Sequence, residues 1–293
     1  ARGFGGLRGA GSAGGPAASL VSALQPPTLD AYPTLRPLFV VGAAGSSIGA
    51  VSDVVARLVM AAAVDPSPAV RHLVLRLMDP RLDAVLARPP LSTTLTACLR
   101  DDSPAVRDAA VSLLARLSPR SPALLMPPLR RLLVDSLSAI PLASGDGHRS
   151  DLLSVVAAVA AASPRIAAAH SSNLAAVLLP AVSDPHPGIA SIALRALCGL
   201  SVAAADVIQP HVNRLLPTIT SFVGDVSSAA RRVAALEALS QLTVNTGTVA
   251  TPQLLVPPLI PLLLACVVAP GGRGGAAATW EVRREALRAL GSL

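Results

Sequence analysis

Few residues of this sequence are spaced as catalytic groups would be. The stretch GAGSAG, Gly9 to Gly14, satisfies the pattern G-x-G-x-x-G, whose glycines let the backbone cradle phosphates at the start of a helix. No strand pattern precedes it, and Pro16 stands where a phosphate-binding loop would continue with Val. Because it lies in a Gly/Ala tract, we interpret it as a chance match.

A second stretch, GHRSD (Gly147 to Asp151), approaches the H-R-D catalytic loop of phosphoryl-transfer enzymes. Its Asp comes one place late, no Asn follows at the required offset, and the chain holds no D-F-G. We therefore interpret it as a turn that leads into a helix.

Metal and disulfide chemistry is not indicated either. No histidine has metal-ligand spacing or a carboxylate constellation beside it, and no C-x-x-C occurs, which fits a reducing compartment. The sequence predicts no catalytic, cofactor-binding or metal-ligating residue. The residues concerned are His72, His148, His170, His186, His211, Cys98, Cys198 and Cys266.

Two other features could serve a function or could have a purely structural role. The serines of four Ser-Pro pairs could be phosphorylated or could cap helices, and we favour capping; they are Ser67, Ser103, Ser121 and Ser163. The pairs Arg130-Arg131 and Arg231-Arg232 could form a basic ridge that faces a partner, but we favour solvated helix faces.

The composition favours many small interfaces over one large core. Of the 293 residues 52% are hydrophobic, mostly Ala, Leu and Val, and only 2% are aromatic. All 24 basic residues are Arg and the net charge is +7, but the aromatic residues are scattered, so sequence-specific nucleic-acid binding is not expected. The apolar run from Leu254 to Ala269 is too short to span a membrane and holds three prolines, which predicts a buried helix and no transmembrane segment.

Residues 1–49 differ from the rest. They are rich in Gly, Ala and Pro and predict a linker or poorly ordered segment, although the absence of acidic residues before Asp30 superficially suits a transit peptide. Since the sequence starts at Ala1 and stops at Leu293 inside a helical pattern, we expect a fragment. Residues 50–293 are expected to form the folded part, incomplete at its C-terminal end.

Within that part, seven letters occur almost identically twice, as DPSPAVR (65–71) and DDSPAVR (101–107). Pro suits the first position of a helix, and the preceding Ser can cap the free amides, so each copy predicts a helix start. Apolar residues then recur at spacings of three and four. They place Val70, Leu73, Val74 and Leu77 on one face, and Val106, Ala110, Leu113 and Leu117 on another.

The Arg of this motif marks a longer series. Related segments recur at intervals of about forty residues, each after another apolar helix pattern. The markers are Arg71, Arg107, Arg149, Ala190, Arg231 and Arg283. The sequence therefore predicts an all-α fold, an α-solenoid of about six helical hairpins.

The period and the pattern D-x-x-P-x-V-R resemble the HEAT repeat of the armadillo-like superfamily. The resemblance implies that Val packs between paired helices and that Asp and Arg form a ladder between successive repeats. Asp65/Arg71, Asp101/Arg107 and Asp225/Arg231 match it. The fourth repeat keeps Asp184 but has Ala190 for Arg, and in the third Asp146 and Arg149 stand too close together.

Several segments are similar, in order, to the HEAT region N-terminal to the kinase domain in target of rapamycin (TOR) serine/threonine kinases. They cover Val54 to Ala87, Asp102 to Leu137, Arg231 to Pro252 and Arg283 to Leu293. Their most specific parts are the D-x-R-L-D turn (79–83), the R-L-S-x-x-x-P-A stretch (116–123), the T-G-x-V-x-x-P loop (246–252) and the final R-R-E-A. Residues 138–208 match weakly.

The resemblance implies a scaffold segment of a nutrient-responsive growth-signalling kinase, with ATP and Mg²⁺ bound only in a kinase domain elsewhere in the parent protein. Implied partners are a raptor-like subunit, a β-propeller subunit and a second TOR protomer. The implied location is cytoplasmic, or endomembrane-associated through partners. The alternatives are a free-standing HEAT adaptor, similar to a phosphatase scaffold or an importin, and a self-contained enzyme.

Overall fold

The computed structural model describes residues 47–248, 251–268 and 279–293, and within these ranges the chain forms helices and no strand. Residues 1–46 of the predicted linker, and with them the GAGSAG stretch, lie outside the described residues. The first described helix, α2, begins at Ser47.

The described residues form six helical hairpins in succession, each with a first and a second helix. The pairs are α2 (Ser47–Val64) with α3 (Pro68–Leu77), α5 (Leu91–Ala97) and η4 (Cys98–Arg100) with α6 (Pro104–Leu117), α7 (Pro122–Ala139) with α8 (Asp146–Ala162), α10 (Ser171–Val182) with α11 (Pro187–Ala203), α12 (Ala205–Gly224) with α13 (Ala229–Thr246), and α14 (Thr251–Leu255) and α15 (Leu259–Val268) with α16 (Trp280–Ser292). Short turns occupy some connections: η3 (Pro80–Leu82), α4 (Asp83–Leu86), η5 (Ile140–Leu142) and α9 (Pro164–Ala169).

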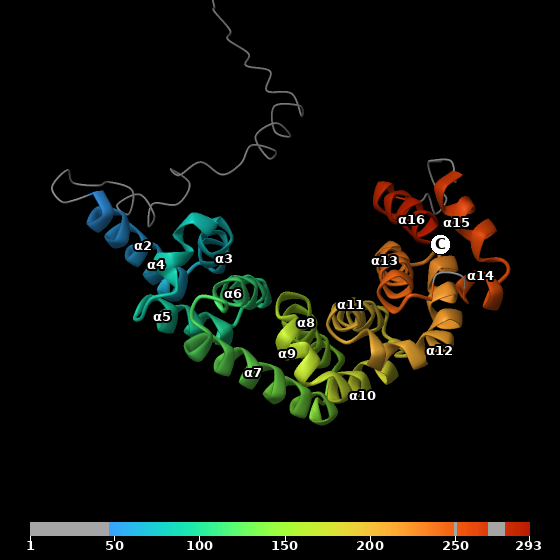
Figure 1. The fold of residues 1–293 in the computed structure, drawn as a ribbon, viewed down its shortest axis with the longest axis horizontal. Coiled ribbons are helices and arrows are strands. Elements are labelled where there is room, and N and C mark those ends of the chain that lie inside the picture. Colours follow the sequence, from blue (N-terminus) through green and yellow to red (C-terminus); the bar gives the residue numbers. More distant parts are fainter. Residues whose placement is uncertain (1–46, 249–250, 269–278) are drawn as a thin grey trace, which may run out of the picture.

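The hairpins stack into an arc (Figure 1). The second helices pack against one another in the order α3, α6, α8, α11, α13, α16 and form the inner row, while the first helices form the outer row. Within the described ranges the main contacts between helices run between neighbouring hairpins, so this is a solenoid, as the repeat pattern predicts.

Proline residues start several of these helices. α3 begins at Pro68 and α6 at Pro104, which confirms the two predicted starts, and α7, α9 and α11 also begin at proline. Proline lacks the amide that would be unpaired at this position, and its φ already suits a helix.

The predicted serine capping is wrong. The side chains of Ser67 and Ser103 make no capping hydrogen bond. Instead, their backbone amides donate to the aspartates two residues earlier, Ser67 N to Asp65 Oδ1 at 2.8 Å and Ser103 N to Asp101 Oδ1 at 2.9 Å. The repeated Asp therefore closes the turn before each helix, because its side chain can bond to the backbone two residues on.

The core runs along the arc between the two rows of helices. The face predicted for α6 is confirmed: Val106, Ala110, Leu113 and Leu117 are all buried. In α3, Val70 and Val74 are buried as predicted, but Leu77 is 71% exposed, and Leu75 and Met78 are buried instead. The buried face of α3 is shifted because it is set by packing against α2 on one side and α6 on the other.

The apolar run near the C-terminus is not the single buried helix predicted. α14 ends at Leu255 and α15 begins at Leu259, with Pro257 and Pro258 between them. α15 buries Leu259, Leu263 and Cys266 and exposes its opposite face. Consecutive prolines cannot supply the amides that a continuous helix would need there.

Across the described ranges, no helix has both the length and the apolar character needed to cross a membrane.

Candidate functional site

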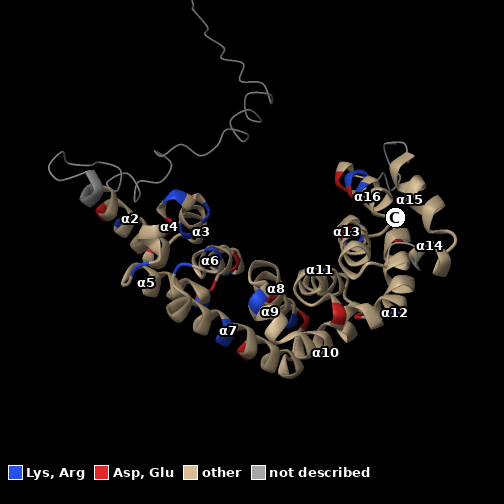
Figure 2. Ribbon diagram, in the orientation of Figure 1, with Lys and Arg blue, Asp and Glu red and all other residues tan. Residues whose placement is uncertain are grey.

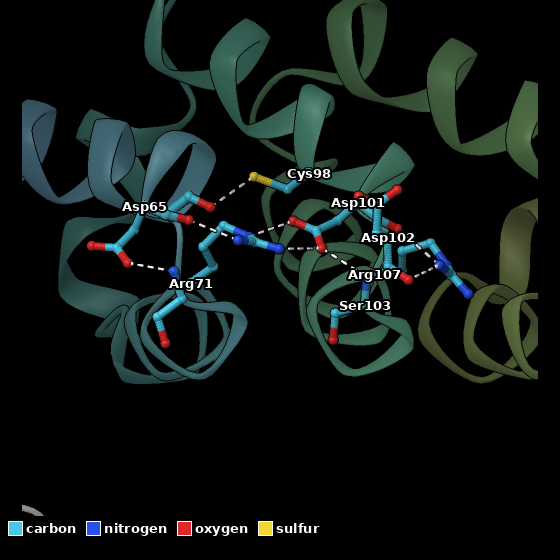
Figure 3. Close-up of polar contacts among 9 residues, drawn as sticks. Asp65, Arg71, Cys98, Asp101, Asp102, Ser103 and Arg107 are labelled. Atoms are coloured by element: carbon cyan, nitrogen blue, oxygen red, sulfur yellow. Dashed lines mark hydrogen bonds and ion pairs between the residues drawn. The ribbon is translucent and has the colours of Figure 1, made fainter.

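Arg71 and Asp101 join the first and second hairpins (Figure 3). Arg71 donates from Nε to Asp101 Oδ2 at 2.6 Å and from Nη2 to Asp101 Oδ1 at 2.8 Å, a bidentate pair. Its Nη1 donates to the carbonyl of Asp65 in its own hairpin at 2.7 Å. Only 14% of the Arg71 side chain and 9% of that of Asp101 are exposed, and the hydrogen bond from Arg71 holds the pKa of Asp101 below its usual range.

A second contact crosses the same junction. Arg116 Nη2, near the end of α6, donates to the Met78 carbonyl at 2.8 Å and to Asp83 Oδ1 at 2.9 Å. Asp83 is buried, and this pair satisfies its charge. Asp83 belongs to the D-x-R-L-D turn and Arg116 begins the R-L-S stretch, so two of the sequence segments singled out above meet here.

The second and third hairpins are joined differently. Arg107 Nη1 donates to the carbonyls of Asp101 and Asp102, at 2.8 and 3.1 Å, and has no carboxylate from the next hairpin. The position that corresponds to Asp101 in the third hairpin, six residues before Arg149, is Ala143.

A cross-repeat ion pair is present at the next junction and absent at the one after it. Arg149 forms an ion pair with Asp184 of the fourth hairpin, although Asp146 stands too close to it to follow the repeat pattern. In the fourth hairpin the marker position is Ala190, and Asp225 of the fifth pairs with Arg231 of its own hairpin at 3.0 Å. In these five hairpins, cross-repeat pairs therefore occur at alternate junctions.

The inner row of helices carries a groove, which we call the inner groove. It has a volume of about 440 Å³ and spans α6, α8, α11 and α13. Its polar rim comprises Asp108, Ser154, Arg195, Glu237 and Gln241, and its floor includes alanines of α8 with Cys198 and Gly199 of α11. Four successive repeats thus contribute to one surface.

Gly199 brings α11 and α8 close together beneath this groove. A Cβ at this position would lie 2.9 Å from the backbone nitrogen of Ala161 and 3.0 Å from the backbone carbon of Ala160. Such distances are too short for a real contact, so the helices could not approach this closely with any other residue there.

The groove combines both signs of charge. Burial raises the pKa of Asp108, although Arg107 and Arg195 oppose that shift. Burial also raises the pKa of the Cys198 thiol strongly, and the nearby Glu237 adds to the shift. Cys198 is therefore an inert thiol that fills the groove floor, because only the thiolate is nucleophilic.

Known proteins resemble this chain in sequence and in fold. A family model described as a HEAT repeat associated with sister chromatid cohesion matches residues 81–114, the segment around α5 and α6. The chain is 28% identical over 218 residues to the serine/threonine-protein kinase TOR2 of Saccharomyces cerevisiae, which covers 74% of this chain and 9% of that protein. It is 28% identical over 247 residues to the serine/threonine-protein kinase mTor of Drosophila melanogaster, covering 83% of this chain and 10% of that protein. The chain is thus similar to TOR kinases over most of its length, and it contains a HEAT repeat.

The chain spans about a tenth of the length of the curated relatives it matches. Among solved structures, Kap121p bound to Pho4p is similar with a TM-score of 0.55 and 15% identity, over 83% of this chain and 28% of that chain. At this identity the likeness shows the solenoid fold alone.

The stretch GHRSD, which approaches a kinase catalytic loop in sequence, has no such geometry in the structure. Gly147 to Asp151 lie within the first turns of α8, which begins at Asp146, rather than in a turn before it. Among the described residues no group of three or more His, Cys, Asp or Glu side chains could hold a metal ion. His170 instead accepts a hydrogen bond from Arg130 Nε at 3.1 Å, and the His186 amide donates to Asp184.

The predicted solvated face at Arg231-Arg232 is wrong. Arg231 pairs with Asp225 and lies over the Phe222 ring at 4.8 Å from its centroid. Arg232 is 8% exposed and donates to the Val223 carbonyl at 3.2 Å and to Cys266 Sγ at 3.2 Å. Both side chains are part of the packing of the last two hairpins, whereas Arg130 and Arg131 are exposed on α7 as predicted.

Sequence reasoning missed the inner groove. Asp108, Arg195 and Glu237 lie on different second helices and share no motif. The repeat pattern did contain a signal for them. Each of these charged residues follows the repeated Arg position of its own second helix by one to six residues. Such residues lie on the inner face once the marker itself is placed at the junction between hairpins.

Proposed function

We propose that this segment is a protein-binding scaffold within a TOR-type serine/threonine kinase and that the inner groove contacts a partner protein. The observation that carries the proposal is the unbroken stacking of the second helices from α3 to α16, which makes one continuous inner surface. Solenoids of this kind use such curved surfaces to bind partners.

The chemistry of the groove supports binding rather than catalysis. Its charged side chains come from separate helices and surround a floor of small residues, which leaves room for side chains of a partner. Charged side chains of both signs can match opposite charges on a partner, and such electrostatic complementarity gives specificity to a protein interface.

For the whole protein we propose ATP-dependent phosphorylation of proteins that control growth in response to nutrients, with ATP and Mg²⁺ bound in a kinase domain outside this segment. The proposed partners are a raptor-like subunit, a β-propeller subunit and a second TOR protomer. The proposed location is cytoplasmic, or endomembrane-associated through these partners. The similarity to the TOR kinases supports these assignments.

A co-purification experiment tests the role of the groove. The tagged chain is co-expressed with the raptor-like and β-propeller subunits of the same organism, as wild type, as Glu237→Arg and as Glu281→Arg. Glu237 lines the groove, while Glu281 is an exposed glutamate of α16 outside it, so the two variants change net charge equally. We expect at least one partner to be retained by wild type and Glu281→Arg and lost with Glu237→Arg; equal retention by all three would contradict the proposed groove.

Two further measurements separate this function from the alternatives. A phosphorylation assay with ATP and the isolated 293 residues should show no transfer, and robust turnover would support a self-contained enzyme. The coding sequence downstream of Leu293 should include a kinase domain, whereas a stop codon shortly after this point would favour a free-standing adaptor.

A further inference from the structure

A second surface lies between α7, a helix of the outer row, and α9. This hollow, which we call the α7 furrow, has a volume of about 670 Å³. Its apolar part includes Met126, Val134 and Ile166, and Val134 is 39% exposed. A volume of this size can receive several side chains of a partner.

The rim of the α7 furrow is basic. Arg130, Arg131 and Arg165 are all exposed there. The acidic residue among the described residues that line it is Asp135, whose side chain is 66% exposed and lies 3.6 Å from that of Arg131. Three arginines against one aspartate leave the lining with a formal excess of two positive charges.

Arg130 is held in place over the furrow. Its Nε donates to His170 Nε2 at 3.1 Å, which uses one of the five donors of the guanidinium. The side chain is therefore oriented by its neighbour while most of its donors stay available for an acceptor. A carboxylate matches these donors because guanidinium and carboxylate can form two parallel hydrogen bonds.

The two neighbouring hollows of the outer row have the same character. One lies between α5 and α7 and is lined by Arg100, Arg131 and Pro127; the other lies between α10 and α12 and is lined by Arg214, His211 and Leu179. Together, the described linings of the three hollows include five arginines and two histidines but one acidic residue. Figure 2 shows basic residues on α7 and α9.

The apolar lining distinguishes between anionic partners. Surfaces that bind single-stranded nucleic acid add aromatic side chains on which bases stack. The described linings of these hollows contain Pro, Leu, Met, Val, Ile and Ala but no Phe, Tyr or Trp. Arginine beside aliphatic pockets suits a polypeptide that carries both carboxylates and aliphatic side chains.

We propose that the α7 furrow binds an acidic segment of a partner protein, with Arg130 and Arg165 contacting its carboxylates and Met126 and Val134 contacting its Leu or Ile side chains. This surface is separate from the inner groove, and the proposal stands whether or not the groove binds a partner.

The test uses a fluorescein-labelled synthetic peptide of about twelve residues in which Asp and Glu alternate with Leu, a length that can lie along a helix-lined furrow. Binding to the 293-residue chain is measured by fluorescence anisotropy for the wild type and for Arg130→Ala/Arg165→Ala. The matched control is Arg81→Ala/Arg120→Ala, which removes the same charge at exposed positions outside the three hollows. Circular dichroism checks that all three proteins keep their helicity.

We expect the furrow variant to bind about tenfold more weakly and the control about as tightly as wild type, since loss of direct charge contacts costs more than loss of remote charge. A peptide with Asn and Gln for Asp and Glu, and one with Ser for Leu, should each bind more weakly than the parent. Equal weakening of both double variants, or equal binding of the three peptides, would overturn the proposal. Tighter binding of an oligodeoxynucleotide or of phosphatidylserine vesicles than of the peptide would also overturn it.

Discussion

The junction between the first and second hairpins and the junction between the second and third start from the same seven-residue motif and end differently. Arg71 and Arg107 each donate to the carbonyl six residues earlier, at 2.7 and 2.8 Å. Arg71 also reaches the carboxylate of Asp101 in the next hairpin, whereas the residue at the corresponding position ahead of Arg107 is Ala143. The motif therefore makes the same local hydrogen bond in both copies. It makes an ion pair to the next hairpin only where that hairpin has an aspartate at the corresponding position.

The junctions along the arc are therefore of two kinds. Carboxylate pairs join the first hairpin to the second and the third to the fourth, and no such ladder pair is formed between the second and third or between the fourth and fifth. Because stacked repeats interact only through nearest-neighbour interfaces, we expect bending of the arc to concentrate at the junctions without a ladder pair.

The largest expected effect is that of Arg71→Ala. Removing Arg71 leaves the Asp101 carboxylate, 9% exposed, without its ion-pair partner, and we expect the free energy of unfolding to fall by about 3 kcal/mol. Arg107→Ala removes bonds to carbonyls alone and should cost about 1 kcal/mol. Urea unfolding followed by circular dichroism measures both.

The two arginines serve as controls for each other, since they share the same motif and the same local bond. Equal losses of stability in the two variants would show that the cross-repeat pair adds nothing to the junction.

Much of the fold could be predicted from the sequence. The period of about forty residues, the proline starts at Pro68 and Pro104 and the buried face of α6 follow from local rules of helix formation and apolar spacing. These rules were enough to predict all six hairpins, because the sequence of each repeat determines its own helices.

The partners of charged residues could not be predicted in the same way. The acceptor of Arg71 lies 30 residues ahead and that of Arg149 lies 35 residues ahead, in another hairpin. The pairing of Arg232 with Cys266 and the assembly of the inner groove likewise depend on how hairpins stack. Spacing within one repeat gives no information on these contacts.

Ala143→Asp should convert the second junction into one like the first. Ala143 follows η5 with φ −68° and ψ 121°, and Asp101 follows η4 with φ −63° and ψ 145°, so the new carboxylate starts from a similar backbone position. We expect a gain of about 1 kcal/mol in the free energy of unfolding, the upper range for an exposed ion pair.

Ala143→Asn is the matched control, because it can close the same turn without a charge. The gain should also disappear when Ala143→Asp is combined with Arg107→Ala, as a double-mutant cycle would reveal. A gain that persists without Arg107 would mean that the aspartate stabilises the turn and not the junction.

The contribution of the first junction should also depend on pH. Because Arg71 lowers the pKa of Asp101 in the folded chain, the pair stabilises the fold fully above the ordinary pKa of an aspartate, about 3.9, and this contribution is lost as the pH falls through the lowered pKa. The difference in stability between wild type and Arg71→Ala should therefore be constant from pH 7 to about pH 5 and shrink below pH 4. The difference between wild type and Arg107→Ala should change much less over the same range, because carbonyl acceptors do not titrate; parallel curves for the two variants would contradict the assignment of Asp101 as the partner that matters.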